Sequence, residues 1–450
     1  MKCRVVYYKD ILKSKRFDGS YHNADVNIYN DVITSHSEHN LQYYCTSIFT
    51  SGRNKRTYTE PEFGVPFLSN ADVSSQSPLM SCKYSSKKYG FDETAVLKGG
   101  MILTGRVGAI GQTSFVPKYW ERYNAMGSDN IIRIVVKPEY KNGFIYAYLA
   151  SKMGNLSFWK HATGGVQPFI TDAMVGNLPI PSFSDSFQQK VDELIQESAR
   201  LREEAAVALE KAVDYFNNKF PISNETTKTF TLGLKDLKLG FAAYNNNLEV
   251  DDFINGYIDN SYELENKTSK IFAPPLFKHI YLTKDNGYPF MTGSELTQFN
   301  LRYYRWLSPR GVKDINDYVV KKGTLLLYKS GTTDGGILGN VFIADKKLDG
   351  CCLSDHVIRV VFNDEKQAYW AFAFLRSKGG VRLLQRLATG TMIPFITPER
   401  LSHISIPNPD DNFNSIIEFV ETYIDKNSES KENEDLAISM VEEEIDKWNN

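Results

Sequence analysis

The sequence predicts two related α+β domains, each followed by a long heptad helix, and the two helices are expected to pack as an antiparallel coiled coil. Three observations lead to this prediction. A chain of 450 residues is too long for one compact core, blocks of its first half recur in its second half, and each half ends in a heptad pattern. The expected boundaries are 1–183 for the first domain, 184–220 for a central spacer helix, 221–409 for the second domain and 410–450 for a C-terminal spacer helix.

The internal repeat keeps a nearly constant offset, which is 223 residues at first and 226 residues further along. The matching blocks are 64–68 with 287–291, 100–108 with 323–331, 128–135 with 354–361, 162–171 with 388–397, and 178–181 with 404–407. Between 162–171 and 388–397, seven of ten residues are identical. Coincidence does not hold one offset over so many blocks, so the pattern indicates a duplication.

The body of each copy has the composition of an α+β domain. Short runs rich in Val, Ile and Phe, such as 131–136 and 357–362, are separated by clusters of Gly, Asn, Asp and Pro, which is typical of strands and turns. Each copy then contains one amphipathic stretch, which predicts a helix from Phe144 to Met153 in the first copy and from Ala368 to Leu384 in the second.

The tail of each copy steps by four and three residues, as the seam of a coiled coil does. The first seam comprises Phe187, Val191, Leu194, Ser198, Leu201, Ala205, Ala208, Ala212 and Tyr215. The second keeps the phase with Phe413, Ile417, Val420, Ile424, Asn427, Lys431, Glu434, Ile438, Val441, Ile445 and Trp448.

Three polar residues interrupt the second seam, and they predict either an exposed loop or a frayed centre of the helix. Two helices of matching length and phase are expected to pack on each other. The alternative is two independent amphipathic helices, each lying on its own domain. About 30 residues of helix would form a rod of roughly 45 Å.

Charge is distributed unevenly along the chain, although the net charge is only −2. Residues 1–180 hold 21 Lys and Arg against 14 Asp and Glu, and residues 221–409 hold 23 against 19. The two spacer segments are acidic, most of all 410–450 with 3 against 13. The basic segments would attract a polyanion such as DNA, and the acidic ones would repel it.

Redox and membrane features point to a cytoplasmic protein. The five cysteines show no Cys-x-x-Cys spacing and no disulfide framework, which favours a reducing compartment. The first residues contain no apolar secretory segment, and no apolar run is long enough to span a bilayer, so no membrane partner is expected.

Motifs of catalysis are absent from the sequence. There is no Asn-Pro-Pro-Tyr loop of an adenine methyltransferase and no phosphate-binding loop of an ATPase. His36 and His39 near Cys45 do not complete a four-ligand metal set, so no metal site is expected.

One enzymatic alternative remains, a stand-alone Mg²⁺-dependent nuclease. Asp129, Glu139 and Lys141 loosely match the two acids and the lysine of such a site. The second copy has Glu365 and Gln367 at the later two positions, so it lacks the lysine. This argues against a nuclease.

The order of the motifs resembles the specificity subunits of type I restriction–modification systems, over nearly the whole chain. The resemblance is carried by the Gly-x-Pro-Phe turn at 64–67, by Ile102-Leu103-Thr104-Gly105-Arg106-Val107-Gly108-Ala109-Ile110-Gly111, and by Gly164-Gly165-Val166-Gln167-Pro168-Phe169-Ile170. The last motif stands before Leu178-Pro179-Ile180-Pro181 and the heptad helix.

The resemblance implies that each copy is a target-recognition domain that reads one half of a bipartite DNA sequence. It also implies that the helices fix the gap between the halves and dock methyltransferase and restriction subunits. No catalytic site and no cofactor are expected in this chain, because S-adenosylmethionine, Mg²⁺ and ATP would be bound by the partner subunits. A specificity module of another DNA-modification or phage-defence system remains an alternative.

Candidate DNA-binding residues follow from the chemistry of base and phosphate contacts, for which Arg, Lys, Gln and Thr are suited. Arg106 and Lys329 hold equivalent positions, each two residues before a glycine. Gln167 is replaced by Ile393 in the second copy, which leaves a shared role for that position open. The full set of candidates is Arg53, Lys55, Arg56, Lys87, Lys88, Arg106, Gln112, Gln167, Arg302, Arg305, Lys329 and Thr391. The candidates for the helix seam and its partners are Val191, Leu194, Leu201, Ala205, Ile417, Val420, Ile438 and Val441.

Overall fold

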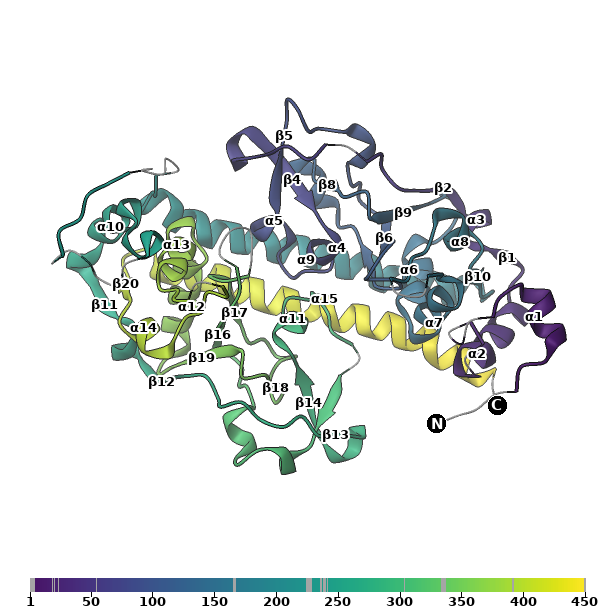
Figure 1. Cartoon of the computed structure of the whole chain (residues 1–450). Helices are drawn as coiled ribbons and strands as arrows, with labels where there is room; N and C mark the ends of the chain where they lie inside the picture. Colours follow the sequence, from purple (N-terminus) through teal and green to yellow (C-terminus); the bar gives the residue numbers. More distant parts are fainter. Residues whose placement is uncertain are drawn as a thin grey trace. The chain divides into compact units, whose positions relative to one another are not determined.

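The computed structural model forms two compact units, each of which contains one copy of the repeat (Figure 1). It describes residues 5–448 apart from 18, 20, 23, 54, 165–166, 224–228, 235–236, 238–239, 241, 303, 333–336 and 391. Unit 1 comprises Met1–Glu203 and Glu429–Asn450, and unit 2 comprises Glu204–Ser428. Each unit therefore includes a segment of both long helices, α9 (Asp185–Lys219) and α15 (Phe413–Lys447).

The described residues of unit 1 form three small sheets. Its first four-stranded sheet has the order β2-β9-β6-β7 and is antiparallel throughout. The second has the order β3-β5-β4-β8, and the pair β4–β8 is parallel. A third pairs β1 with β10. The strands are β1 His39–Asn40, β2 Cys45–Phe49, β3 Tyr58–Thr59, β4 Gly64–Leu68, β5 Lys83–Ser86, β6 Ile102–Gly105, β7 Thr113–Phe115, β8 Met126–Gly127, β9 Ile131–Val136 and β10 Pro179–Ile180.

Unit 2 repeats this topology strand for strand. Its sheets have the orders β12-β19-β16-β17, β13-β15-β14-β18 and β11-β20, and the pair β14–β18 is again the parallel one. The strands are β11 Ser261–Glu263, β12 Thr268–Phe272, β13 Tyr281–Leu282, β14 Tyr288–Met291, β15 Arg305–Leu307, β16 Leu325–Tyr328, β17 Val341–Ile343, β18 Cys352–Leu353, β19 Val357–Phe362 and β20 Ser405–Pro407. Even the register shift recurs, at Cys45/Ser47 in β2 and at Thr268/Lys270 in β12.

Short helices surround the sheets of each unit. Those of unit 1 are α1 Tyr8–Ser14, α2 Ala24–Ser35, α3 Leu41–Tyr44, α4 Asn70–Val73, α5 Pro78–Ser81, α6 Asn142–Ala150, α7 Lys152–His161 and α8 Asp172–Gly176. Those of unit 2 are α10 Leu248–Asn255, α11 Gly293–Leu296, α12 Glu365–Leu375, α13 Lys378–Arg386 and α14 Pro398–Ser402.

The prediction of a single amphipathic helix in each copy is wrong, because a sharp corner divides each one into two helices. The corner residue of unit 1 is Ser151, whose Oγ accepts a hydrogen bond from the Gly154 N–H at 3.1 Å and so caps α7. Ser377 caps α13 through Gly380 at the same distance. Serine oxygen at this position satisfies a backbone donor that would otherwise have no partner.

Glycine is required at both corners because the second helix starts against the end of the first. A Cβ atom on Gly154 would lie 2.2 Å from the carbonyl oxygen of Tyr148. A Cβ atom on Gly380 would lie 2.3 Å from the carbonyl oxygen of Phe374. The amphipathic pattern of the sequence does not reveal this close approach.

The polar interruption of the second seam is neither a loop nor a frayed centre, because α15 is helical without a break from Phe413 to Lys447. Two polar residues of this region, Ser430 and Glu434, have partners within unit 1. The Ser430 hydroxyl donates to the carbonyl oxygen of Ser198 at 2.7 Å, and the Ser198 hydroxyl donates to the carbonyl oxygen of Ser430 at 2.8 Å. Glu434 accepts a hydrogen bond from the hydroxyl of Tyr146. Buried polar groups of this kind are tolerated when they are paired.

Most seam residues contribute to the apolar cores of the units. In unit 1, Val191, Ile438 and Val441 lie in one core with the first sheet and with α6 and α7. In unit 2, Ala205, Ile417 and Val420 lie in one core with α10, α12 and α13. Leu201 is also fully buried, whereas Leu194 is half-buried. Each core thus draws apolar residues from both long helices.

Candidate nucleic-acid interface

A turn that follows β6 places Arg106 at the meeting point of three segments of unit 1. The Arg106 N–H donates to the carbonyl oxygen of Asn130 at 2.8 Å, which ties the turn to the segment before β9. The Arg106 carbonyl oxygen accepts from the Ile170 N–H at 2.9 Å, which ties it to the loop 163–169. That loop is closed by two backbone hydrogen bonds between Thr163 and Phe169, at 2.9 and 2.7 Å.

The same arrangement recurs around Lys329 in unit 2. The Lys329 N–H donates to the carbonyl oxygen of His356 at 2.8 Å, and its carbonyl oxygen accepts from the Ile396 N–H at 2.7 Å. Thr389 and Phe395 close the equivalent loop with two hydrogen bonds of 2.8 Å. Arg106 and Lys329 are both half-buried, and the structure gives neither side chain an ion pair within the described part of the chain. Each copy therefore holds one cation beside a loop that is closed at its base.

The loop tips carry different side chains. In unit 1, Gln167 is exposed, and in unit 2, Met392 and Ile393 are exposed. Thr391, which we also predicted from the sequence to contact DNA, lies outside the described residues. Both loops turn at a glycine with positive φ, Gly164 at 99° and Gly390 at 91°, a conformation that favours glycine.

Two buried arginines that the sequence analysis did not single out hold the segments before β9 and β19. Arg133 is 0% exposed and donates to the carbonyl oxygens of Ser128 and Ile131 at 3.1 and 2.7 Å. It also donates to the carbonyl oxygens of Ala95 and Gly127. Burial lowers the pKa of Arg133 to about 10, so the guanidinium stays protonated at neutral pH.

Arg359 makes the same contacts in unit 2. It is 1% exposed and donates to the carbonyl oxygens of Ser354 and Leu353 at 3.0 and 2.7 Å, and also to those of Val357 and Tyr318. Burial lowers its pKa to about 10 as well. A charged residue repeated inside an apolar strand was a signal that could have revealed both arginines.

A cluster of cations in unit 1 lies near the same segment. Arg56 forms an ion pair with Asp129 at 2.8 Å, and the Arg53 Nε atom lies 3.9 Å from the other carboxylate oxygen. Lys55 lines the same small hollow as Arg56 and Asp129. Asp129 directly precedes Asn130, to which Arg106 is bonded, so Arg53, Lys55, Arg56 and Arg106 gather around one turn. Exposed pairs of this kind contribute little to stability and remain available to exchange partners.

The remaining predicted residues lie elsewhere in their units. Lys87 and Lys88 are exposed directly after β5, and the Lys88 ammonium lies 4.9 Å from the ring centre of Tyr89. Arg305 in β15 pairs with Glu295 at 2.8 Å and donates to the Tyr281 hydroxyl at 3.1 Å. Arg302 is half-buried, and so is Gln112, whose N–H donates to the carbonyl oxygen of Ala109 at 3.2 Å.

The three residues of the nuclease alternative are not assembled into one site. Asp129 precedes β9, whereas Glu139 and Lys141 follow it, and a strand of six residues spans about 20 Å. Asp129 is paired with Arg56, and Glu139 and Lys141 line a different hollow. The geometry gives no support to a nuclease.

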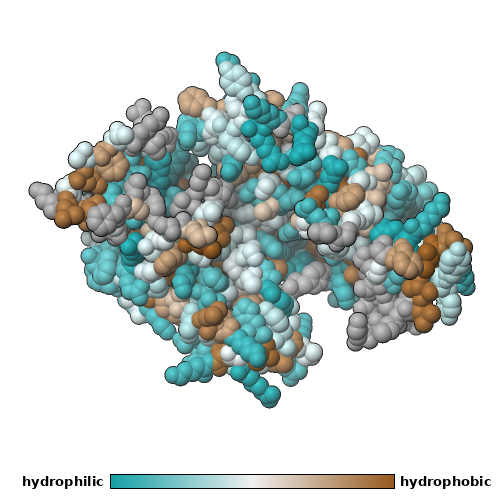
Figure 2. All heavy atoms as spheres, viewed as in Figure 1, coloured by the Kyte–Doolittle hydropathy of each residue, from teal (hydrophilic) through white to brown (hydrophobic). Residues whose placement is uncertain are grey.

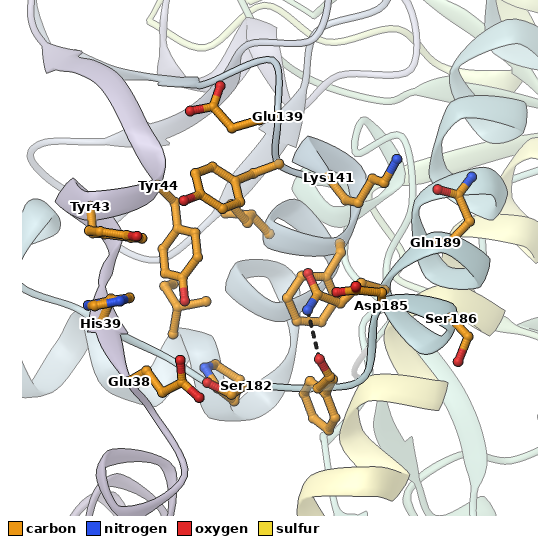
Figure 3. Close-up of a pocket in the computed structure, with 17 residues that line it drawn as sticks. Glu38, His39, Tyr43, Tyr44, Glu139, Lys141, Ser182, Asp185, Ser186 and Gln189 are labelled. Atoms are coloured by element: carbon orange, nitrogen blue, oxygen red, sulfur yellow. Dashed lines mark hydrogen bonds between the residues drawn. The ribbon is translucent and has the colours of Figure 1, made fainter.

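That hollow is a pocket of about 810 Å³ in unit 1, walled by aromatic rings (Figure 3). His39 stacks on Tyr43 with ring centres 3.6 Å apart, and Tyr44 and Tyr140 continue the wall. The start of α9 forms the opposite side with Asp185 and Gln189 (Figure 3). The sequence analysis missed this pocket, because its residues come from three distant segments.

The side chains considered as metal ligands do not form a metal site. His36 stacks on Trp448, His39 stacks on Tyr43, and Cys45 is buried in the core. Burial raises the pKa of the Cys45 thiol to about 12, so it stays protonated and is a poor ligand. In the described part of the chain, the group of three side chains that could hold a metal is Glu263, Glu265 and His403, and all three are exposed.

The visible surface carries few large apolar areas. Figure 2 shows hydrophilic side chains over most of the viewed face, with apolar side chains in small groups between them. No helix among those described is long and apolar enough to cross a membrane.

Comparison with known proteins gives one match to a family and several to solved structures. The model of the type I restriction modification DNA specificity domain matches residues 270–438. Among curated proteins, none matches the sequence.

Two of the similar solved structures are specificity subunits. The HsdS subunit from Thermoanaerobacter tengcongensis has 14% identity and a TM-score of 0.28, with 91% of this chain and 95% of that chain covered. The S subunit of a type I restriction–modification system from M. genitalium has 11% identity and a TM-score of 0.31, with 91% and 93% covered.

The family model covers most of the second copy, and the motifs of that copy recur in the same order in the first. Residues 270–438 therefore match the type I restriction modification DNA specificity domain, and the first copy repeats the motifs of that region in the same order.

Proposed function

We propose that this chain reads a bipartite DNA target, with one half-site for each copy of the repeat. The observation that carries the proposal is the cation beside a closed loop that occurs at equivalent positions in both units, Arg106 with 163–169 and Lys329 with 389–395. A cation at such a place can hold a phosphate, and the side chains of an adjacent projecting loop can reach base edges in the major groove.

Within this proposal the other predicted residues have secondary roles. Arg53, Lys55 and Arg56 hold phosphates near the turn of Arg106, and Asp129 gives up its ion pairs when DNA binds. Lys87, Lys88, Arg302 and Arg305 lie further along each domain and extend the contact with the backbone of the duplex. Gln112 and Gln167 donate hydrogen bonds to bases or to nearby phosphates.

The long helices are proposed to act as a spacer built as an antiparallel coiled coil. The proposed division is 1–183 and 221–409 for the recognition domains, with 184–220 and 410–450 as the spacer helices. Two observations support it: the reciprocal hydrogen bonds of Ser198 with Ser430 in unit 1, and the shared core of Ala205, Ile417 and Val420 in unit 2. A rod of roughly 45 Å exceeds one turn of B-DNA, about 34–36 Å, so two separate major-groove segments come within reach.

The chemistry is assigned to partners. Methyltransferase subunits would methylate adenine with S-adenosylmethionine, and restriction subunits would cleave with Mg²⁺ and ATP. The specificity subunits of the family are not known to bind cofactors themselves. Exposed positions of the spacer helices, which are acidic, are the proposed docking sites for these partners.

A map of methylated adenines in the source cell, made with and without this gene, tests the proposed function. We expect a split motif of two short half-sites around a fixed gap to disappear on deletion. A map that does not change, although the methyltransferase is expressed, would contradict the proposal.

The spacer is tested by adding four residues to each long helix, one insertion after Ala205 and a matching one in the facing part of α15. Four residues lengthen a helix by about 6 Å, which corresponds to about two base pairs. We expect the gap in the mapped motif to grow by that amount while both half-sites stay the same. An unchanged gap in an intact complex would rule out the spacer role.

A further inference from the structure

The loop tips of the two units are built alike but present opposite chemistry. Thr163 and Phe169 close the first loop, and Thr389 and Phe395 close the second, each pair through two backbone hydrogen bonds. The exposed residue of the first tip is Gln167, which carries hydrogen-bonding groups. The equivalent residue of the second tip is Ile393, which carries none.

The second tip holds two adjacent apolar side chains in solvent. Met392 is 93% exposed and Ile393 is 68% exposed. The loop is fixed from below, because the Gly331 N–H donates to the carbonyl oxygen of Pro394 at 3.1 Å and the Ile396 N–H donates to the carbonyl oxygen of Lys329 at 2.7 Å. These side chains therefore cannot turn into the core of unit 2 unless the hydrogen bonds at the base of the loop break.

A cation, Lys329, lies at the base of the loop that carries this apolar tip. Lys329, from the turn after β16, is hydrogen-bonded to the base of the loop through its own backbone. An apolar pair beside a cation suits a surface that offers both a negative charge and a small apolar group. The major groove of DNA does so, because phosphates flank it and each thymine projects a C5-methyl group into it.

We propose that Ile393, next to the exposed Met392, reads thymine in the second half-site by contact with its C5-methyl group, while Lys329 holds a neighbouring phosphate. This inference rests on the proposed function and adds the chemistry by which the second copy recognises its bases. An isoleucine side chain cannot donate or accept a hydrogen bond, so among the base edges of the major groove the thymine methyl is the group that it can recognise. The first copy, with Gln167 at the same position, reads by hydrogen bonds instead.

The test replaces thymine by uracil, which removes the methyl group and leaves the hydrogen-bonding groups in place. The probe is a duplex that carries the motif from the methylation map, and the protein is the purified complex of the full chain with its methyltransferase. Each thymine of both half-sites is replaced in turn, and the dissociation constant is measured. We expect about fourfold weaker binding for at least one thymine of the second half-site, since one methyl group is buried there.

Ile393→Gln is the matched variant, because it gives the second tip the residue that the first tip carries. We expect this variant to bind the thymine and uracil duplexes equally well. Its thermal unfolding should match that of the parent, because Ile393 is exposed. Uracil in the first half-site is the internal control. It should leave the dissociation constant unchanged, because Gln167 is proposed to read its base by hydrogen bonds, which uracil retains.

The outcomes separate the inference from the proposed function. If the thymine duplex binds no more tightly than a scrambled duplex, the proposed function fails, and the inference falls with it. If the thymine duplex binds specifically and no uracil in the second half-site weakens it, the inference alone is overturned. An effect of uracil that is retained in Ile393→Gln would also overturn it.

Discussion

Arg133 in the first copy and Arg359 in the second are the same residue in the same environment, whereas Gln167 and Ile393 occupy equivalent positions and share no chemistry. The arginines are buried and each donates to four backbone carbonyl oxygens that correspond one to one between the copies. The loop residues are exposed and have no such constraint.

The difference indicates which parts of the repeat form the frame and which parts can vary. Backbone bonds at Arg106 and Lys329, the serine corners and the buried arginines keep each loop in place. The side chains that project from the frame differ between the copies, so one architecture presents different chemistry at its two loop tips.

The largest effect is expected from removing either buried arginine. Arg133→Met and Arg359→Met each leave four carbonyl oxygens without their donor, and hydrogen bonds to a charged group are each worth about 1.5–3 kcal/mol. We expect the free energy of unfolding of the affected unit to fall by about 3–5 kcal/mol, measured by urea denaturation with a probe in that unit.

Equal losses in the two units would support equivalent roles for the two arginines. If Arg133→Met lowered the free energy of unfolding and Arg359→Met did not, the two arginines would not be equivalent, because the frame would then differ between the copies. Lys9→Met serves as the control, since Lys9 is exposed in α1 and is expected to change stability by less than about 0.5 kcal/mol.

A smaller loss is expected at the helix corners. Gly→Ala within a helix normally stabilises it by about 1 kcal/mol. At Gly154 and Gly380 the new Cβ atom would meet a carbonyl oxygen at 2.2 and 2.3 Å, so we expect a loss of about 2–3 kcal/mol in both units.

Gly256→Ala is the matched control for the corner glycines. It ends α10 in a right-handed conformation, and its nearest neighbour would lie at 3.3 Å. Thermal unfolding of the three variants distinguishes a clash from a general effect of glycine. If Gly154→Ala proved as harmless as Gly256→Ala, the tight corner would not be a requirement of the fold.

The smallest effect is expected from the two half-buried cations beside the loops. Arg106→Ala and Lys329→Ala each remove one proposed phosphate contact, so we expect binding of specific DNA to weaken about tenfold without loss of stability. The slope of log Kd against log salt should fall by about 0.9 for each variant. Titrations at several salt concentrations measure both quantities.

These titrations, together with the methylation map, also distinguish a base contact from a phosphate contact in each copy. If Arg106 reads a base, its loss will change the mapped first half-site as well as the affinity. If only the affinity changes, and by the same factor for Lys329, both residues hold phosphates.

Local patterns predicted much of the fold. The alternation of Val, Ile and Phe with turn residues predicted strands at 131–136 and 357–362, where β9 and β19 lie. The heptad steps predicted the long helices, because a seam of apolar residues at that spacing is visible in the sequence without any knowledge of its partner.

The errors arose where a residue's role depends on a distant partner. The polar centre of α15 was expected to form an exposed loop or a frayed centre of the helix, but it is helical, and Ser430 within it bonds to Ser198, which is 232 residues away in the sequence. The corners at Ser151 and Ser377 were not predicted, because glycine is necessary at Gly154 and Gly380 through the approach of two helices and not through the local pattern.

The candidate site was predictable in its types of residue and not in its grouping. Arg106, Lys329 and Gln167 stand in repeated motifs, so the sequence indicated them. That Arg53 and Arg56 gather at Asp129 beside Arg106, whereas Arg305 is bonded to Glu295 and Tyr281, depends on strand pairing across many residues.

The sequence by itself therefore determined that the chain is built twice, with α+β bodies and heptad helices, since periodicity and repetition are local properties of a chain. Only the tertiary structure decided which polar side chains are buried and paired, and which apolar ones remain in solvent at the tip of a closed loop. The physical reason is that burial and hydrogen bonding depend on contacts between distant segments, and a side chain such as Arg133 or Ile393 acquires its role only when those segments meet.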